Sequence, residues 1–430
     1  MILRTSPRAS RGLLFLSLIA SAFLVYFSIR NARAAHAVDL NTRAGYEQAA
    51  RLEPANARNW FLLGSFYQND FENADPEAAL HALLVARSLD PLSSETLLAL
   101  ATNYSDAGKF DDARASYVEA ERAAPLSAEV HWSYGNFLLR QNEIPAAFSQ
   151  IKKAVQADPK RSAEAFSRCH RVVPDVGEIL DNVIPRNLEA YLDIIFDLTN
   201  DGQLDVALSV WSRAAALPGA LQVLDVTPLA NALLQNNRPR DAALLWQEAM
   251  QKLKKPIPPD ASGSILWDGG FEAGFQHGGL GWFYQPVIKG VQIQTDPQEK
   301  HSGEQSLRLI FASRTNLAFD NICHVVVAEP GKTYEFSAWI KTKSVTSNEG
   351  PRFVVAAGVG NKVFSAHTAD VHGDQPWTRV SLTWTQPQDT EIVRVCAARY
   401  QSDLPDGEIA GTAWIDDVSF VPVAAEHANR

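Results

Sequence analysis

Apolar and small residues in the central part of the chain recur at a fixed spacing of 34 positions. The recurring sets are Ala79, Ala113 and Ala147; Leu83, Tyr117 and Ile151; Ala86, Ala120 and Ala154; and Pro91, Pro125 and Pro159. A period of this length predicts stacked helix–turn–helix units, none of which buries its apolar face alone. Small residues let two helices cross closely, and each proline ends the second helix of its unit. The pattern predicts an all-α solenoid, which usually presents a surface to partners.

The quality of this pattern varies along the array, which we place at residues 39–255. Two copies, 94–125 and 128–159, are complete, and the copy before them has three extra residues in its turn around 69–76. The remaining parts are a capping helix over 42–52, an irregular helical insert or degraded repeat over 161–186, and looser copies over 191–214 and 229–249.

Beyond residue 255 the helical period ends and short alternating segments begin. The proline-rich stretch 256–263 predicts a stiff linker. The alternating segments are 291–295, 306–311, 323–328, 334–341, 352–357, 378–385, 391–400 and 413–421. Because alternation is typical of half-buried strands, they predict an all-β sandwich or jelly roll over 264–424, followed by a tail at 425–430.

The N-terminal segment, residues 1–38, is basic and apolar. It holds five arginines and no acid, and the 18 residues from Gly12 to Ile29 carry no charge. A run of this length just suffices to cross a bilayer as a helix, so we expect a membrane-anchor helix over 12–29. The alternative is a signal peptide cleaved near Ala34 or Ala37, where small residues recur. Either way, the body is expected to be exported, to the periplasmic or extracellular side.

The repeats resemble the tetratricopeptide repeat family at its signature positions. In the two complete copies these positions hold Leu97, Leu100, Ala101, Tyr104, Gly108, Ala113, Tyr117, Ala120 and Pro125, then Tyr134, Gly135, Leu138, Ala147, Ile151, Ala154 and Pro159. The resemblance implies that the first helices of successive pairs line a concave groove that binds protein partners. Amide and guanidinium groups would grip an extended peptide there, and the candidates are Asn59, Asn103, Asn136 and Arg140.

The C-terminal part resembles carbohydrate-binding modules of the 4/9 group, which are β-jelly-rolls within the galactose-binding-like fold. Five stretches carry the resemblance in the order of the family: 268–272, 301–308, 330–339, 377–380 and 414–419. The resemblance implies a polysaccharide ligand and one structural calcium ion at the edge of the sandwich.

The calcium ligands that the resemblance implies are Glu272 and either Asp416 or Asp417, with backbone carbonyls near His301. Calcium takes several hard oxygen ligands, which two distant segments could supply together. The alternative is that these carboxylates accept hydrogen bonds from turn amides. No other cofactor is expected.

Aromatic residues are the candidates for sugar contact, because sugars present flat C–H faces that stack on rings. Trp282 and Tyr284 follow a glycine-rich loop that can hold rings at the surface, and Tyr400 ends a predicted strand. These three are the candidate glycan-binding residues. The remaining tryptophans of the predicted strands are expected in the core: Trp339, Trp377, Trp384 and Trp414.

The net charge bears on which partners the protein binds, and the cysteines bear on whether it forms a disulfide. The formal charge is −10, and without the five N-terminal arginines the body has 34 bases against 49 acids, or −15. A body of this sign repels phosphate backbones, so no nucleic-acid partner is expected. Of the three cysteines, Cys323 and Cys396 fall on predicted strands; they either pair as a disulfide or remain buried thiols.

The chain carries no motif of catalysis: it lacks G-x-S-x-G, H-E-x-x-H, a phosphate-binding glycine loop and a dinucleotide fingerprint. We therefore expect a non-catalytic, membrane-tethered adaptor with protein partners on its repeats and a glycan on its jelly roll, in surface polysaccharide export or assembly. Two alternatives remain open. The protein is a pure protein–protein scaffold with a structural jelly roll, or it is an accessory subunit of a polysaccharide-processing enzyme.

Overall fold

The computed structural model describes residues 7–70, 74–253, 263–275, 278–284, 289–312, 315–405 and 407–423. The chain forms two compact units, Met1–Pro185 and Arg186–Arg430. Within the described residues, fourteen α-helices precede two antiparallel β-sheets, which confirms the predicted fold class. Residues 1–6, nearly all of the predicted linker and the predicted tail lie outside the described residues.

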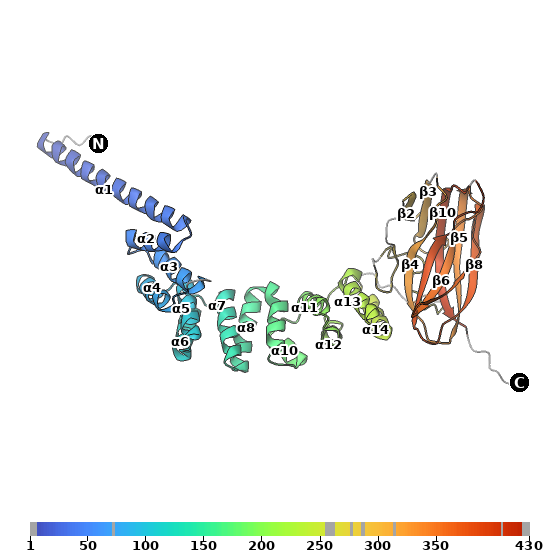
Figure 1. Ribbon diagram of the computed structural model, residues 1–430, viewed down its shortest axis with the longest axis horizontal. Coiled ribbons are helices and arrows are strands. Elements are labelled where there is room, and N and C mark those ends of the chain that lie inside the picture. Colours follow the sequence, from blue (N-terminus) through green and yellow to red (C-terminus); the bar gives the residue numbers. More distant parts are fainter. Residues whose placement is uncertain are drawn as a thin grey trace. The chain divides into compact units, whose positions relative to one another are not determined.

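The first unit is a series of antiparallel helix pairs (Figure 1). Its helices are α1 (Pro7–Asp39), α2 (Arg43–Leu52), α3 (Ala57–Asn69), α4 (Pro76–Leu89), α5 (Ser94–Asp106), α6 (Phe110–Ala123), α7 (Ala128–Arg140), α8 (Ile144–Ala157), α9 (Ser162–His170) and α10 (Val176–Asn182). Helix α2 occupies the residues of the predicted capping helix and packs against α1. The first three predicted repeats are the pairs α3–α4, α5–α6 and α7–α8.

The helix boundaries repeat as regularly as the apolar positions. Ser93 and Ser127, which are 34 residues apart, cap α5 and α7, because each side-chain oxygen accepts a hydrogen bond from an amide of the first turn. Pro91 and Pro125 stand two residues beyond the ends of α4 and α6, where proline cannot continue a helix. Local chemistry therefore fixes where α5 and α7 begin and where α4 and α6 end.

The helices of a pair cross closely because one of them carries a small residue at the crossing point. A Cβ built on Gly64 of α3 would lie 2.7 Å from Cγ of Leu83 in α4. The equivalent position in the third pair is Gly135, whose Cβ would lie 2.5 Å from Cγ1 of Ile151. These are the small and large positions of the sequence period, so the period reports direct packing partners.

Two short helices, α9 and α10, occupy the stretch that breaks the period. A 3-10 turn, η1 (Pro159–Arg161), leads into α9, and Pro174 lies in the turn between the two helices. Both helices pack against each other and α10 also contacts α8. The irregular stretch is thus a shortened helix pair, which favours the degraded-repeat interpretation.

The second unit begins with two further helix pairs. They are α11 (Leu188–Asn200) with α12 (Leu204–Ala214), and α13 (Val223–Gln235) with α14 (Pro239–Lys252). The indole N–H of Trp211 in α12 donates to the Glu248 carboxylate in α14 at 2.7 Å. Trp211 and Trp246 are both buried. They take the position that Tyr117 and Ile151 hold in the complete copies, so the looser copies keep this large residue, although they lack the proline eight positions later.

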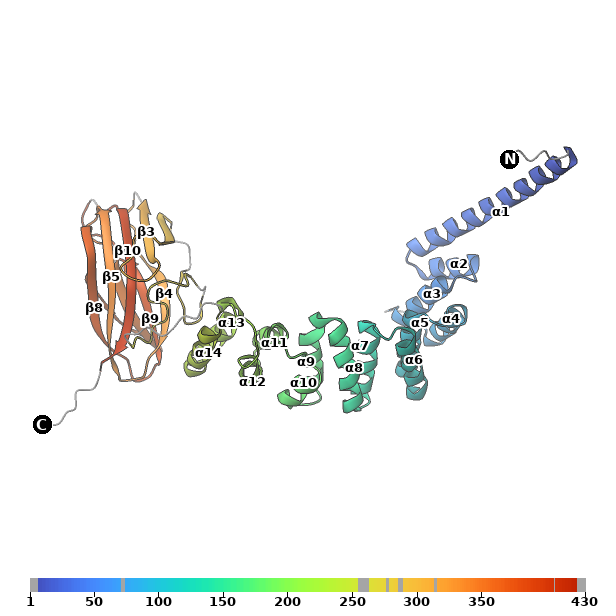
Figure 2. The same ribbon diagram turned by 180° about the vertical axis from the view of Figure 1, so that it is seen from behind.

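Ten strands follow, arranged in two five-stranded sheets that face each other (Figures 1 and 2). They are β1 (Phe283–Tyr284), β2 (Val291–Asp296), β3 (Ser306–Ala312), β4 (Phe319–Val327), β5 (Thr333–Val345), β6 (Arg352–Val359), β7 (Lys362–His367), β8 (Gly373–Thr385), β9 (Ile392–Arg399) and β10 (Ala410–Pro422). We call β1-β4-β9-β6-β7 the first sheet and β2-β3-β10-β5-β8 the second sheet.

The eight predicted segments correspond to strands, whereas β1 and β7 were not predicted. Strand β1 has only two residues, too few for a pattern. Strand β7 lies at an edge of the first sheet and is exposed along most of its length, so it lacks the alternation of a half-buried strand.

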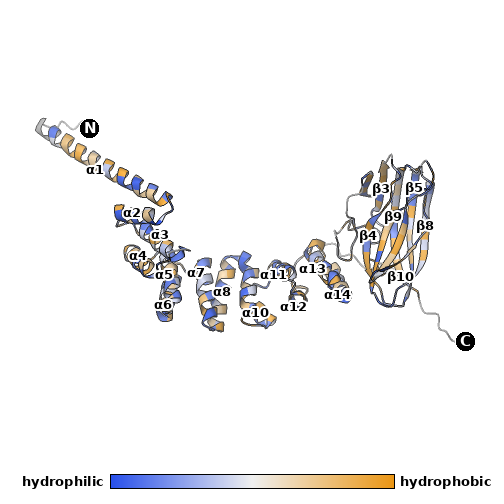
Figure 3. Ribbon diagram, viewed as in Figure 1, coloured by the Kyte–Doolittle hydropathy of each residue, from blue (hydrophilic) through white to orange (hydrophobic). Residues whose placement is uncertain are grey.

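The core of the sandwich lies between the two inner faces. Phe336 and Phe353 meet across the sheets with ring centroids 5.0 Å apart, and Tyr334 stacks on Phe420 at 4.9 Å. Trp384 is buried in the same core, as its place in the alternation of the strand predicts. In Figure 3 apolar and polar residues alternate along the strands, which is the pattern that identified them.

Candidate ligand-binding sites

Trp282, a candidate sugar-contacting residue, is a core residue in the structure. Its side chain is 0% exposed, its ring stacks on Phe271 at 4.6 Å, and its indole N–H donates to the Asp268 carbonyl at 2.9 Å. The glycine-rich loop turns the ring inward because the apolar indole gains more from burial than from exposure. The prediction that Trp282 contacts a ligand at the surface is therefore wrong.

Tyr284 has a different environment, at the edge of the first sheet. It is half-buried, lies edge-on to Phe275 with ring centroids 4.8 Å apart, and lines a cavity of about 230 Å³. Phe283 and Val325 form the strand side of the cavity, and Asn231 and Gln235 of α13 form the helix side. Apolar rings and neutral amides thus face one space.

Helices α13 and α14 hold this arrangement through contacts with the sandwich. The Gly279 amide donates to Oδ1 of Asn231 at 2.7 Å, and Arg240 of α14 pairs with Glu391 at 2.5 Å. Trp246 packs so close to Gly279 that a Cβ there would lie 2.2 Å from its ring. A second cavity, of about 270 Å³, lies between α14 and β4 and includes Gln247 and Val325 in its lining.

Tyr400 is exposed at the end of β9, with 38% of its surface accessible. The Arg352 guanidinium lies 4.7 Å from the centre of its ring, and His367 meets it edge-on at 5.6 Å. Arg352 is itself held by Glu349 and by Asp370, the latter at 3.5 Å. Tyr400 is therefore a fixed, open aromatic ring on the first sheet.

The outer face of the first sheet connects these two regions. Pairing places Phe283, Cys323, Cys396, Val354 and His367 opposite one another across all five strands. Phe283 lines the Tyr284 cavity at one end of this row, and His367 contacts Tyr400 at the other.

The second sheet carries tryptophans on its outer face rather than in the core. Trp339 and Trp377 are half-buried, and the His301 ring stacks on Trp339 at 4.1 Å and meets Trp377 edge-on at 5.7 Å. Trp414 is buried, but beneath the cations of Arg308 and Lys341, which lie 5.7 and 5.8 Å from its ring centre. The expectation of core positions for Trp339 and Trp377 is wrong, because both lie at positions of their strands whose side chains point away from the core.

The four predicted calcium-site residues come together at one edge of the sandwich. Asp416 accepts hydrogen bonds from the amides of His301 at 2.7 Å and Ser302 at 3.1 Å. Asp417 contacts Nδ1 of His301 at 2.5 Å. Glu272 accepts from the Glu304 amide at 2.7 Å. The carboxylates thus hold the 301–304 turn, as the alternative interpretation expected.

Two of these carboxylates also border a common space. A Cβ built on Gly270 would lie 3.6 Å from Oδ1 of Asp416 and 3.6 Å from Oε1 of Glu272, so both carboxylates border one space. Oε2 of Glu272 is buried and has no hydrogen-bond partner among the described residues. Burial raises the pKa of Asp416 to about 6, although backbone amides donate to it. No group of three His, Cys, Asp or Glu side chains in the described ranges forms a metal site, so backbone oxygens would complete the coordination.

Two of the four candidate groove residues are structural. Asn59 is buried and donates from Nδ2 to the Ala49 carbonyl at 3.3 Å and to Glu53 at 3.1 Å. Asn103 is buried and donates to the Pro76 carbonyl at 3.2 Å. Their amides hold neighbouring helix pairs together, so the prediction that they line a peptide groove is wrong.

The other two candidates lie on α7. Asn136 is half-buried and donates to the Trp132 carbonyl one turn earlier, and Arg140 is exposed at the end of the helix. The two side chains are one turn apart on one helix face and both reach solvent. They stay candidates for contact with a partner.

Sequence patterns did not single out several residues that these sites use. Asn231 and Gln235 are one turn apart on α13, and that spacing on the first helix of the last predicted repeat was the available signal. Phe283 and His367 lie on the two strands that were not predicted.

Cys323 and Cys396 are joined by a disulfide between β4 and β9, with their Cα atoms 4.1 Å apart. This settles the choice that the sequence left open, because the two residues are directly opposite in the register. Cys169 is free and buried in α9, and burial raises the pKa of its thiol to about 12.

Helix α1 is long and apolar enough to cross a membrane, by length and composition. In the described part of the chain it is the one helix that meets this test. Its two candidate cleavage positions, Ala34 and Ala37, are 1% and 2% exposed because they pack on α2. A Cβ on Gly45 of α2 would lie 2.3 Å from the Ala37 carbonyl oxygen.

The fold and these sites define a helical-repeat protein with a C-terminal sandwich. Residues 98–162 match the tetratricopeptide repeat family. No curated protein matches the chain.

Solved structures match the two parts separately. A family 16 carbohydrate-binding module is 16% identical, covering 36% of this chain and 99% of its own, with a TM-score of 0.27. The family 22 module of Clostridium thermocellum Xyn10B is 18% identical, covering 39% and 99%, with a TM-score of 0.29. YrrB, a tetratricopeptide repeat protein with a peptide-binding site, is 14% identical, covering 50% and 95%, with a TM-score of 0.26. These modules belong to families 16 and 22, whereas the sequence motifs resemble the 4/9 group.

Proposed function

We propose that the protein is a non-catalytic, membrane-anchored adaptor whose body is exported. Its helix pairs bind protein partners, and its sandwich binds a glycan on the outer face of the first sheet. Surface polysaccharide export or assembly is the setting that suits an anchored protein with these two kinds of module.

The packing of α1 supports an uncleaved anchor. Cleavage after Ala34 or Ala37 would remove residues that are buried against α2. The close approach of Gly45 to the Ala37 carbonyl belongs to the same contact. The Cys323–Cys396 disulfide supports export, because disulfides persist in oxidising compartments.

The cavity lined by Tyr284 carries the glycan proposal. An aromatic ring and neutral amides are the groups that bind a sugar, whose faces are apolar and whose rim is hydroxylated. Tyr284 supplies the ring, and Asn231 and Gln235 supply the amides. Tyr400 offers a second, exposed ring on the outer face of the first sheet, which Phe283 of the cavity shares, whereas Tyr284 is paired with the core residue Ile322.

Affinity electrophoresis of the full-length chain in neutral detergent, with a panel of acidic and neutral polysaccharides, tests this function. We expect retardation by at least one polysaccharide, and a loss of retardation in Tyr284→Ala and Asn231→Ala. Glu335→Gln, an exposed change on the second sheet, is the matched control. Tyr400→Ala shows whether the second ring contributes. No retardation by any polysaccharide, with or without calcium, would overturn glycan binding.

We also propose a structural calcium ion held by Glu272 and Asp416, with Asp417 and backbone oxygens near His301 nearby. The ion would neutralise two carboxylates that border one space, and would tie β10 to the 268–272 and 301–304 turns. It would stabilise the sandwich and take no part in chemistry.

A pure protein–protein scaffold is the second candidate, and the contacts of α13 and α14 with the sandwich favour it. The Asn231–Gly279 hydrogen bond and the Arg240–Glu391 pair make the sandwich a cover for the last helix pair, which a structural jelly roll would be. Affinity capture with Asn136→Ala/Arg140→Ala and with Tyr284→Ala in the full chain separates the two. Loss of protein partners only with the α7 variant, and no glycan retention, would support the scaffold.

A further inference from the structure

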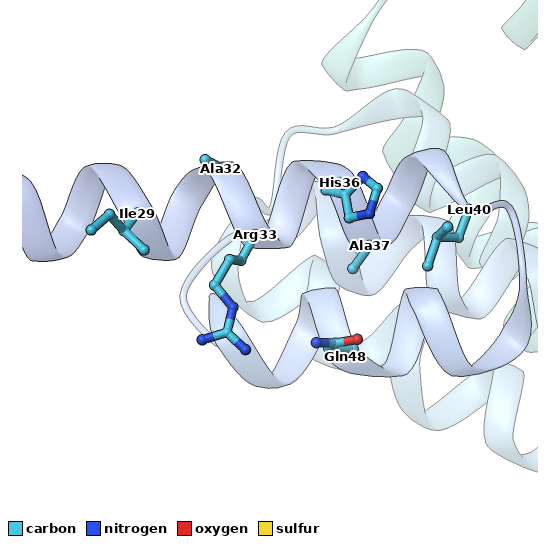
Figure 4. Close-up of a pocket in the computed structure, with 7 residues that line it drawn as sticks. All are labelled: Ile29, Ala32, Arg33, His36, Ala37, Leu40 and Gln48. Atoms are coloured by element: carbon cyan, nitrogen blue, oxygen red, sulfur yellow. The ribbon is translucent and has the colours of Figure 1, made fainter.

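A cavity of about 460 Å³ opens between α1 and α2, where the apolar part of α1 ends (Figure 4). Ile29, Ala32, Arg33 and His36 line it from α1, and Gln48 lines it from α2. Figure 4 shows Arg33 extending from α1 toward α2, with Gln48 on the facing helix. One wall is therefore apolar, and the other groups are cationic or hydrogen-bonding.

The position of the cavity along α1 coincides with the expected membrane surface. Ile29 is the last residue of the uncharged run, and Arg33 lies one turn further, about 6 Å along the helix axis. Residues at this depth meet lipid headgroups, while the preceding turns meet acyl chains. A molecule in the cavity would touch both layers.

The arginines near the cavity differ in whether they form ion pairs. Arg43 and Arg51 of α2 both bind Glu47, at 3.1 and 2.9 Å. Arg33, in contrast, makes no ion pair with any residue in the described ranges. Its guanidinium lines the cavity together with the His36 ring.

We propose that this cavity binds the headgroup of an anionic phospholipid, with the phosphate against Arg33 and Gln48 and the acyl chains along α1. The proposal rests on the proposed membrane anchoring. Arginine is suited to phosphate because its planar fork donates two parallel hydrogen bonds. A basic residue next to an anionic membrane surface is attracted to the lipid phosphates.

The apolar wall distinguishes a phospholipid from a free phosphate ion. Ile29 and Ala32 offer no hydrogen bonds, so they add nothing to the binding of a bare ion. They contact hydrocarbon well, so buried methylene groups of an acyl chain add to the affinity. A bound lipid would fill the angle between the anchor and the first helix of the array, and so stiffen that joint.

Native mass spectrometry of the full-length chain in neutral detergent micelles tests the proposal. Phosphatidylglycerol and phosphatidylcholine with the same acyl chains are titrated in parallel. We expect one high-occupancy phosphatidylglycerol, at least threefold preferred over phosphatidylcholine. In Arg33→Gln its affinity falls about fivefold, which corresponds to about 1 kcal/mol. Arg33→Lys retains most of it, and Ala32→Phe, which fills the cavity without changing charge, abolishes the preference.

Arg51→Gln is the matched control, because Arg51 is an exposed arginine on α2 that does not line the cavity. Equal loss in Arg33→Gln and Arg51→Gln would mean only a diffuse surface attraction and would overturn the proposal, as would no preference in the wild-type chain. Competition by inorganic phosphate as strong as that by the lipid would assign the cavity to a free ion and also overturn it. Carbonate extraction of membranes tests the anchor separately: release of the chain contradicts anchoring, whereas retention without lipid preference contradicts only the headgroup site.

Discussion

Gly135 and Ile151 are in contact so close that a Cβ added to Gly135 would lie 2.5 Å from Cγ1 of Ile151. A larger residue must push α7 away from α8, and overpacking of this kind costs about 1 to 3 kcal/mol. We therefore expect Gly135→Leu to lower the free energy of unfolding by about 3 kcal/mol, as measured by urea denaturation followed by far-ultraviolet circular dichroism. Arg140→Leu, exposed on the same helix, is the control and should change stability by less than about 0.5 kcal/mol. Equal effects of the two variants would show that the crossing is not tightly packed.

The burial of Trp282 leads to a second prediction. Its ring packs on Phe271 and meets His324 edge-on at 5.2 Å, so its removal leaves a cavity in the sandwich. Trp282→Ala should lower the stability of the folded protein by about 3 to 5 kcal/mol. Tyr400→Ala, which removes an exposed ring, should leave the unfolding temperature nearly unchanged. A Trp282→Ala variant that melts with the wild-type protein would show that the ring is not part of the core.

The fold could be predicted from the sequence because its two periods, 34 residues in the repeats and two residues in the strands, mark the residues that pack in the core. Leu83, Tyr117 and Ile151, which are 34 positions apart, are all buried, and Leu83 and Ile151 pack against glycines of the facing helix. Alternation along the strands likewise reports which face is buried, as Trp384 illustrates. Strand β7 was not predicted, because an exposed edge strand has no buried face and therefore no alternation of apolar and polar residues.

The sites followed from the sequence only in part, because residue type alone does not say which way a side chain points. Trp282 and Tyr284 are only two residues apart, yet Trp282 is fully buried and Tyr284 lines a cavity. Asn59 and Asn103 carry amides that could bind a peptide, but these amides donate hydrogen bonds to backbone carbonyls of neighbouring helices. The cavity between α13 and β1 joins residues that are about 50 positions apart, and no local pattern encodes such proximity.

The Cys323–Cys396 disulfide gives a third prediction. It closes a loop with a sequence separation of 73, and constraint of the unfolded chain by such a loop is worth up to about 4 kcal/mol. Cys323→Ala/Cys396→Ala should therefore be less stable by up to that amount. Under denaturing, non-reducing conditions iodoacetamide should label one thiol, that of Cys169, and after reduction three. Three labelled thiols before reduction would contradict the disulfide.

A fourth prediction concerns pH and His324, which is fully buried in β4. Burial lowers the pKa of His324 from 6.5 to about 4, and backbone groups of Trp267 and Val325 oppose this only partly. Between pH 6.5 and pH 4 the unfolded chain binds a proton at this position that the folded protein does not, so the free energy of unfolding falls as the pH falls. The loss should reach about 2 kcal/mol at pH 5.

The control for the pH prediction is His324→Leu, which keeps every other titrating group. Chemical denaturation of both proteins at pH 7, 6 and 5 should show a shallower fall for the variant. Parallel curves would show that His324 binds its proton equally well in the folded and unfolded states and would contradict the depressed pKa.

The proposed calcium ion gives the last prediction. Glu272 and Asp416 border one space, and an ion there binds the folded sandwich but not the unfolded chain. Calcium at about 100 times its dissociation constant should then add about 2.7 kcal/mol to the free energy of unfolding. Glu272→Gln should abolish the gain because it removes a charged oxygen ligand, whereas Glu335→Gln, exposed on the outer face of the second sheet, should keep it. Thermal unfolding with calcium and with a chelator measures both. If calcium stabilises the Glu272→Gln variant as much as the wild-type protein, the ion binds elsewhere; if it stabilises neither, the carboxylates serve only to hold the 301–304 turn.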